Sequence, residues 1–427
     1  MELYVHIPFC VRKCKYCDFL SFPADEITKK HYVEALCNEI TYCGRMLPNI
    51  LIEEKNGLRE NEADFATKNE EKTAKARKMG KVAVDTIYFG GGTPTALPVD
   101  KLVQILQKIK EEFVINDDAE ITFECNPATI DKNGLQKLQK NGVNRLSIGL
   151  QSTFDDELKL LGRIHNYDDF LQIFTWARTV GFKNLNVDLI SALPGQTAEK
   201  YKMSLQRLIE LQPEHISSYS LILEEGTPFF EKYNKCLEML PDEETDREMY
   251  HLTKTLLQEA GYERYEISNY AKPGFESKHN SGYWKRVPYL GLGLGASSLI
   301  NNTRYRKKGD LALYLQFFGM QEKTCKIAKN EKMVIFPMEL LEEREILDVV
   351  DQMGEFMYLG LRMSKGVLSE DFYKEFHKDL WQIYGDVIEK LVKEGLLIVE
   401  KEGGGKRIFL SEFGMDVSNY VFEKFLI

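Results

Sequence analysis

Short runs of β-branched and aromatic residues alternate with longer helical stretches from the start of the chain to about residue 270. Six of these runs are candidate strands, at residues 3–7, 85–89, 120–124, 145–150, 184–190 and 215–223. Apolar residues recur every three or four positions in segments between them, such as 28–45, 100–113 and 198–211. Strands that alternate with helices build parallel sheets, so the pattern predicts an α/β fold, a partial (β/α)6 barrel with its helices outside. Ligands of such barrels bind at the carboxyl ends of the strands.

Three regions are expected along the chain. Residues 1–270 form the predicted barrel core, residues 271–337 a connecting region, and residues 338–427 a smaller C-terminal domain. Within the barrel, residues 53–81 are charged and almost devoid of large apolar side chains. This composition predicts a solvated or disordered surface insertion after the helix at 28–45. A regulatory role is an alternative to an ordinary surface loop.

The C-terminal domain has its own pattern. Two helical segments, 339–363 and 371–395, precede a predicted β-hairpin and a last helix, which is the order of a winged-helix-like domain. Winged-helix modules can bind DNA. However, Glu400 and Glu402 offset the basic residues of the hairpin turn, and the net charge of the whole chain is −10. We therefore do not expect a nucleic-acid partner.

Only three of the eight cysteines are clustered, and they follow the first predicted strand directly, as Cys10-Val-Arg-Lys-Cys14-Lys-Tyr-Cys17. No export signal and no membrane-spanning run is evident in the sequence, so a cytoplasmic location is expected. In that reducing compartment clustered thiols indicate a metal site. Three thiolates leave one iron of a 4Fe-4S cubane open, and the amino and carboxylate groups of S-adenosylmethionine (SAM) can chelate it. The main alternative, a zinc site, normally closes with a fourth nearby Cys or His, and no fourth Cys follows Cys17 nearby.

A second motif, Gly90-Gly91-Gly92-Thr93-Pro94, follows the second predicted strand. Consecutive glycines let the backbone approach a ligand closely and expose amide and carbonyl groups to a charged amino acid moiety. A tight turn explains a glycine run equally well. Its position after the second strand of a barrel that carries the cysteine loop favours the ligand-binding interpretation.

Polar side chains recur near other strand ends: Glu124, Gln151 and Asp188, with Arg163 on the helix after the fourth strand. A carboxylate can hold an ammonium group or a pair of ribose hydroxyls, and Arg can hold a carboxylate in a bidentate manner. Each of them alone could be a structural hydrogen-bonding group. Together they predict a pocket for a nucleoside that carries an amino acid.

Several motifs resemble one protein family: LYVHIPFCVRKCKYCDF, YFGGGTPT, ITFECNP, RLSIGLQS, LGRIHN, NVDLISALPGQT and HISSYSLILEEGTPF. They are similar to the oxygen-independent coproporphyrinogen III oxidase family of radical SAM proteins. The oxidases carry a further Cys at the position of Phe19, and this departure resembles the HemW branch, regarded as heme chaperones. The segment from His279 to Trp284 also fits the HNxxYW pattern associated with heme binding in that branch.

The resemblance implies a 4Fe-4S cluster, SAM and heme as cofactors. It implies Cys10, Cys14 and Cys17 as cluster ligands, His279 as a heme contact, and SAM contacts by Tyr4, Tyr16, Gly91, Gly92, Thr93, Glu124 and Arg163. Gln151 and Asp188 match positions that bind a second SAM in the oxidases. The implied partners are heme or porphyrin, an unknown heme-acceptor protein, and an electron donor such as flavodoxin or ferredoxin.

The HNSGYW segment has two interpretations from its residues alone. Imidazole is an axial ligand of heme iron, and Tyr283 and Trp284 supply flat apolar faces. A packed loop whose aromatic residues anchor it in the core is the alternative. Three functions therefore compete: a heme chaperone, an oxidase that decarboxylates the propionates of coproporphyrinogen, and a winged-helix regulator.

Overall fold

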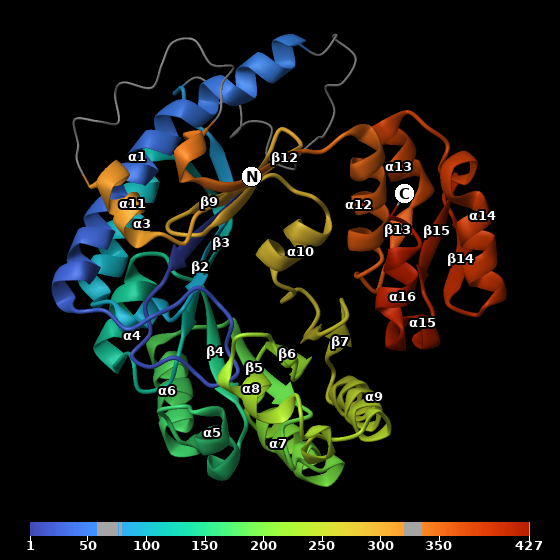
Figure 1. The fold of residues 1–427 in the computed structure, drawn as a ribbon, viewed down its shortest axis with the longest axis horizontal. Helices are drawn as coiled ribbons and strands as arrows, with labels where there is room; N and C mark the ends of the chain where they lie inside the picture. Colours follow the sequence, from blue (N-terminus) through green and yellow to red (C-terminus); the bar gives the residue numbers. More distant parts are fainter. Residues whose placement is uncertain (58–75, 77–78, 320–334, 427) are drawn as a thin grey trace.

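Six parallel strands form the centre of the molecule. The structure is a computed structural model that describes residues 1–57, 76, 79–319 and 335–426. The strands lie side by side in chain order, each paired in parallel with the next. They are β1 (Glu2–Ile7), β2 (Ala83–Gly91), β3 (Val114–Cys125), β4 (Arg145–Gln151), β5 (Leu185–Ser191) and β6 (His215–Ser220). This topology confirms the predicted α/β fold with a partial (β/α)6 barrel, and Figure 1 shows its strands along an arc with helices outside.

The helices follow the strands in alternation. They are α1 (Glu26–Gly57), α3 (Val99–Glu112), α4 (Lys132–Lys140), α5 (Asp155–Leu161), α6 (Tyr167–Val180), α7 (Ala198–Leu211), α8 (Pro228–Tyr233) and α9 (Glu243–Glu259), with short 3-10 turns at Pro94–Ala96 and Leu237–Met239. Local signals set their ends: α6 begins with a capping box of Asn166 and Asp169 and ends at Gly181, whose φ of 108° favours glycine. Within the described part of the chain, no helix is long and apolar enough to cross a membrane.

The helix predicted at 28–45 is longer than expected. It forms the first part of α1, which continues to Gly57. At the start of the predicted surface insertion at 53–81, the backbone of residues 53–57 is helical. Residues 58–75 and 77–78 of that insertion lie outside the described residues.

Shorter strands extend the sheet beyond both edges of the barrel. β9 (Tyr289–Leu292) pairs in parallel with β1, and antiparallel strands follow it: β10 (Ser297–Ile300), β11 (Thr303–Lys307) and β12 (Leu341–Ile346). At the other edge lie β8 (Asn269–Ala271) and β7 (Glu263–Arg264). The remaining elements of this region are α10 (Lys278–Trp284), α11 (Leu311–Phe318) and a 3-10 turn at Met338–Leu340. The region expected to connect two domains thus contributes three strands to the large sheet.

Strand β12 corrects a prediction. We expected residues 339–363 to form one helix, yet residues 341–346 pair with β11 in the large sheet. Cross-strand ion pairs stabilise this arrangement: Arg304 with Glu345 (2.9 Å) and Arg306 with Glu342 (3.2 Å). The tertiary environment thus overrides the helix propensity of a Glu-rich and Leu-rich segment.

The C-terminal domain has the element order of a winged helix. It contains α12 (Val349–Gly360), β13 (Val367–Leu368), α13 (Ser369–Phe376), α14 (Leu380–Lys393), β14 (Leu397–Glu402), β15 (Gly405–Leu410), α15 (Glu412–Asp416) and α16 (Ser418–Glu423). Its three strands form a separate sheet, and its buried apolar residues form a second core. The predicted helix at 371–395 is two helices, because His377 adopts a left-handed conformation (φ 52°) and Asp379 caps α14.

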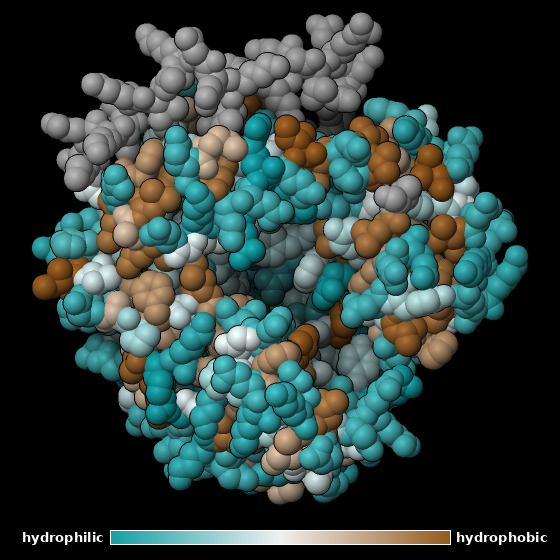
Figure 2. Space-filling model, in the orientation of Figure 1, coloured by the Kyte–Doolittle hydropathy of each residue, from teal (hydrophilic) through white to brown (hydrophobic). Residues whose placement is uncertain are grey.

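The two faces of each barrel strand differ in polarity. On β4, Leu146, Ile148 and Leu150 belong to the apolar core, whereas Arg145 and Ser147 alternate with them and face the interior of the barrel. The molecular surface is hollowed at its centre, beside the C-terminal domain, and residues deep in the hollow are hydrophilic (Figure 2). The barrel interior is therefore a polar environment.

A buried ion pair ties α1 to the extended edge of the sheet. Glu39 is fully buried and pairs with Lys307, which is 2% exposed. Glu39 also accepts hydrogen bonds from the Tyr314 hydroxyl (2.6 Å) and the Gly293 amide (2.7 Å). The neighbouring Tyr32 donates to the carbonyl of His6 (2.7 Å), so this network also positions the end of β1.

We predict that Lys307→Met lowers the free energy of unfolding by about 3–5 kcal/mol, because Glu39 would be left buried without its cation. Urea titration of the full chain measures this loss. The matched control is Lys137→Met, which breaks the exposed pair of Lys137 with Asp100 and should cost at most about 1 kcal/mol. Equal losses in the two variants would contradict the structural role of the buried pair.

Candidate functional site

The three clustered cysteines lie on one loop between β1 and α1. Cys10, Cys14 and Cys17 are half-buried free thiols. Backbone hydrogen bonds join the two ends of their segment. The amide of Cys10 donates to the carbonyl of Phe22 (3.2 Å), and the amide of Phe22 donates to the carbonyl of Pro8 (2.9 Å). The loop therefore presents its thiols at the carboxyl end of the barrel, as predicted from their position after the first strand.

The glycine motif lies directly against this loop. The amide of Gly92 donates to Ile7 and that of Thr93 to Phe9, and the Thr93 hydroxyl is 3.6 Å from Cys10 Sγ. A Cβ on Gly92 would lie only 3.0 Å from the same sulfur, so a larger residue would displace the thiol. Gly91 has a φ of 112°, which favours glycine.

Arg163 joins the cysteine loop to two strand ends. Its guanidinium donates to Cys14 Sγ (3.6 Å), to the Gly149 carbonyl (2.6 Å) and to Asn126 Oδ1. The Asn126 amide donates in turn to the Thr93 hydroxyl (2.6 Å). Asn126 thus connects two predicted site residues, and the sequence analysis missed it. Its position directly after the third strand was the available signal.

Glu124 points from β3 into the barrel and accepts a hydrogen bond from the Tyr88 hydroxyl (2.9 Å). Burial raises the pKa of Glu124 to about 8, and the Tyr88 hydrogen bond opposes that shift. Burial likewise raises the pKa of Asp188, although Asn186 donates to its carboxylate (2.7 Å). Both carboxyls are therefore held in a poorly solvated interior, where a cationic or hydroxyl-bearing ligand would find acceptors.

The remaining predicted SAM contacts surround the same end of the barrel. Tyr4 is hydrogen-bonded through its hydroxyl to His6 Nδ1 (3.1 Å), and Tyr16 contacts Phe229 with ring centroids 6.4 Å apart. Gln151 has a φ of 72° at an irregularity of β4, and its amide lies 3.1 Å from the position of a Cβ on Gly149. The structure therefore places the Gln151 amide and the Arg163 guanidinium close to Gly149.

His279 lies apart from the cysteine loop, on α10, and is 1% exposed. Its Nδ1 is hydrogen-bonded to the Thr86 hydroxyl (2.7 Å) and its Nε2 to the Tyr283 hydroxyl (2.9 Å), so both ring nitrogens are used. The ring stacks on Tyr88 with centroids 5.1 Å apart. Burial lowers the pKa of His279 to about 3, which keeps the imidazole neutral. Tyr88 thus contacts both His279 and Glu124.

Helix α10 also contacts the C-terminal domain. Trp284 lies under the guanidinium of Arg362 (4.2 Å from its carbon to the ring centroid), and Arg286, just after the helix, pairs with Glu355 (3.0 Å) and Glu375 (2.8 Å). Figure 1 shows α10 between the barrel and the C-terminal domain. The HNSGYW segment therefore packs against both parts of the molecule.

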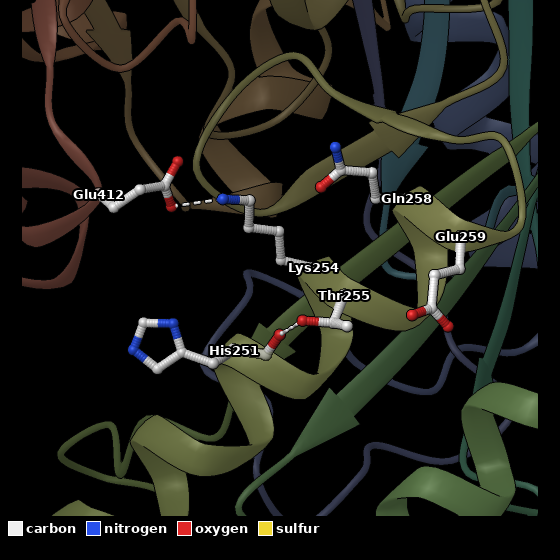
Figure 3. Close-up of a pocket in the computed structure, with 6 residues that line it drawn as sticks. All are labelled: His251, Lys254, Thr255, Gln258, Glu259 and Glu412. Carbon is white, nitrogen blue, oxygen red and sulfur yellow. Dashed lines mark hydrogen bonds and ion pairs between the residues drawn. The ribbon is translucent and has the colours of Figure 1, made fainter.

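A separate surface pocket lies between α9 and the C-terminal domain (Figure 3). It is lined by His251, Lys254, Thr255, Gln258, Glu259 and Glu412. Lys254 pairs with Glu412 across it (2.7 Å), and none of the predicted site residues lines it. Its lining side chains are all charged or polar. Its ion pair joins α9 to α15.

The donor set of the cysteine loop fits an iron–sulfur cluster. Among the described residues, no three Cys, His, Asp or Glu side chains converge on a single metal ion. A cubane does not need such convergence, because each thiolate binds a different iron atom. The loop also places a guanidinium beside a thiol and leaves Arg163 Nε buried without a hydrogen-bond partner, which suits an anionic group at this position.

Comparisons with known proteins cover nearly the whole chain. A model of the radical SAM superfamily matches residues 4–208, and a model of the HemN C-terminal domain matches residues 347–404. The chain is 34% identical to the heme chaperone HemW of Lactococcus lactis, over 99% of this chain and 97% of that protein. It is 32% identical to that of Bacillus subtilis, over 99% and 98%.

Two further relatives extend the comparison. The mitochondrial radical S-adenosyl methionine domain-containing protein 1 of Mus musculus is 31% identical over 94% of this chain and 82% of its own length. Among solved structures, coproporphyrinogen III oxidase HemN from Escherichia coli has a TM-score of 0.75 at 22% identity, covering 99% of this chain and 89% of that one. At 22% identity, the likeness to this oxidase concerns the fold alone.

We predict that Glu124 destabilises the folded protein increasingly as pH rises. Its folded pKa lies above the unfolded value of 4.5, so the folded protein binds the extra proton, and its stability falls as pH rises from 4.5 to about 8. Glu124→Gln should remove this loss, so the stability of the variant relative to wild type should increase between pH 5 and pH 8. Urea unfolding at both values measures the difference. A constant difference would contradict a buried, protonated Glu124.

Proposed function

The chain belongs to the radical SAM superfamily, in the family of the heme chaperone HemW, and from this premise we propose that it binds heme and transfers it to an acceptor protein. The observation that carries the proposal is the full-length likeness to HemW proteins, which includes the cysteine loop and the HNSGYW segment. A cytoplasmic location, where thiols stay reduced, is part of the proposal.

We propose that Cys10, Cys14 and Cys17 ligate a 4Fe-4S cluster and that SAM binds beside it. A reduced cluster supplies a single electron to the sulfonium of SAM. The glycine motif is suited to approach the amino acid part of SAM, and Arg163 is suited to its carboxylate or to the charge of the cluster. Glu124, Gln151, Asp188, Tyr4 and Tyr16 are the further contacts we propose.

An electron donor must approach the cysteine loop. The loop exposes the basic residues Arg12, Lys13 and Lys15 together with the apolar side chains Val11 (61% exposed) and Phe19 (64% exposed). Basic charge around a redox site favours an acidic donor such as flavodoxin or ferredoxin, through electrostatic steering of the encounter.

Heme ligation by His279 requires a local rearrangement. Its neutral imidazole is the form that can bind iron, but Nε2 is engaged by Tyr283 and the ring is buried. Iron would therefore replace the Tyr283 hydroxyl as the partner of Nε2, and α10 would have to move to admit the porphyrin. Because α10 also contacts the C-terminal domain through Trp284 and Arg286, that domain is placed to control this movement.

We predict that hemin titration of the reconstituted protein gives a Soret band that His279→Ala weakens or shifts. Tyr283→Phe should have the opposite effect and raise hemin affinity by up to about tenfold, because Nε2 is freed from a hydrogen bond. The control is His215→Ala, another buried His with both ring nitrogens bonded, to Asn186 and Tyr265. An unchanged spectrum in His279→Ala would remove His279 from the heme site.

Oxidative decarboxylation of coproporphyrinogen is the alternative function. Against it stands Phe19, exposed on the cysteine loop where the oxidases carry a further Cys. We predict no decarboxylation of coproporphyrinogen III in an anaerobic assay with reductant and SAM, measured as loss of propionate carboxylates by mass spectrometry. Stoichiometric turnover would overturn the chaperone proposal.

A further inference from the structure

The guanidinium of Arg145 is buried in the barrel without a partner. The residue is 1% exposed, and no hydrogen bond or ion pair joins its guanidinium to any residue that the structure describes. A guanidinium carries five N–H donors and stays protonated at all physiological pH values. Native structures rarely leave a buried charge of this kind unsatisfied, so this position calls for a partner from outside the chain.

Arg145 points into the interior of the barrel. It lies at the start of β4, on the strand face opposite the apolar core residues Leu146 and Ile148. Its register partner on β3 is Thr122, which is 0% exposed and whose hydroxyl also has no hydrogen-bond partner. Two neighbouring strands thus present unpartnered donors on the same interior face, one from a guanidinium and one from a hydroxyl.

The ionisable groups around Arg145 are pushed toward their neutral forms. Its charge acts on Glu124, Asp188, His215 and His279, which come from β3, β5, β6 and α10. Burial raises the pKa of the two carboxyls and lowers that of the two imidazoles. Tyr88 and Tyr265 also face the guanidinium and stay protonated, because burial raises their pKa. Among these groups, Arg145 is the one that stays charged at every physiological pH.

We propose that Arg145 and Thr122 form a carboxylate-binding site inside the barrel. The planar fork of a guanidinium matches a carboxylate in a bidentate manner, and the Thr122 hydroxyl supplies a further donor. Among the ligands of the proposed function, heme carries such a group in its propionates, whereas the methionyl carboxylate of SAM is used at the cluster. The inference deepens that function and rests on it for the source of the carboxylate.

The test compares ligands with and without the carboxylate. Dissociation constants of the reconstituted full chain are measured for hemin, hemin dimethyl ester and SAM, in wild type and Arg145→Gln. Hemin should bind about 10 to 100 times more weakly to Arg145→Gln, whereas SAM should bind both proteins equally well. Esterification of the propionates should weaken hemin binding to wild type by a similar factor and have no further effect in the variant.

A second arm tests the site without heme. Sodium propionate at constant ionic strength should raise the melting temperature of wild type, relative to chloride, and not that of Arg145→Gln. Failure of wild type to bind hemin would overturn the proposed function, and the propionate arm would still decide whether this site binds carboxylates. Equal behaviour of wild type and Arg145→Gln toward both hemin and propionate would overturn the inference.

Two controls separate binding from folding. Arg178→Gln removes an arginine that pairs with Glu214 (2.8 Å) outside the barrel interior, and should leave all dissociation constants unchanged. Arg145→Lys keeps the charge but loses the bidentate fork, and provides the same comparison if Arg145→Gln fails to fold. Its affinity should lie between those of wild type and Arg145→Gln.

Discussion

The guanidinium of Arg163 holds together three segments that meet at the carboxyl end of the barrel. It donates to the thiol of Cys14, to the backbone carbonyl of Gly149 near the end of β4 and to the side chain of Asn126 after β3. The Asn126 amide in turn donates a hydrogen bond to Thr93, whose hydroxyl lies beside Cys10. The parallel order of the strands brings these loops to one edge, and the shared guanidinium then fixes the cysteine loop relative to the glycine motif. The site depends on this cross-connection.

The interior of the barrel links that site to His279 on α10. Tyr88 donates to Glu124 and stacks on His279, whose helix contacts the C-terminal domain. A displacement of α10 would therefore remove a packing partner of Tyr88 and alter the hydrogen bond that moderates the pKa of Glu124. Heme at α10 and SAM at the strand ends would then influence each other's affinity, and by thermodynamic linkage the effect would be mutual.

Local sequence patterns predicted much of this architecture. The six parallel strands and the alternating helices follow from periodicity, and the cysteine loop follows from its spacing. Strand β12 could not be predicted, because cross-strand pairs with Arg304 and Arg306 decide its conformation and lie far away in the sequence. The roles of Asn126 and Tyr88 likewise depend on contacts between strands. Periodicity predicts which face of β4 carries Arg145, but only the packed barrel reveals that its guanidinium has no partner.

The central claim is that three thiolates of one loop hold a cubane whose fourth iron is open to SAM. Low-temperature electron paramagnetic resonance of the anaerobically reconstituted, reduced protein tests it most directly, recorded with and without SAM labelled at its amino nitrogen. The account predicts a cubane signal that SAM shifts, with hyperfine coupling to the labelled nitrogen, and its loss when Cys10, Cys14 and Cys17 are replaced by Ala. A signal that SAM leaves unchanged, or cluster iron retained by the triple variant, would contradict it.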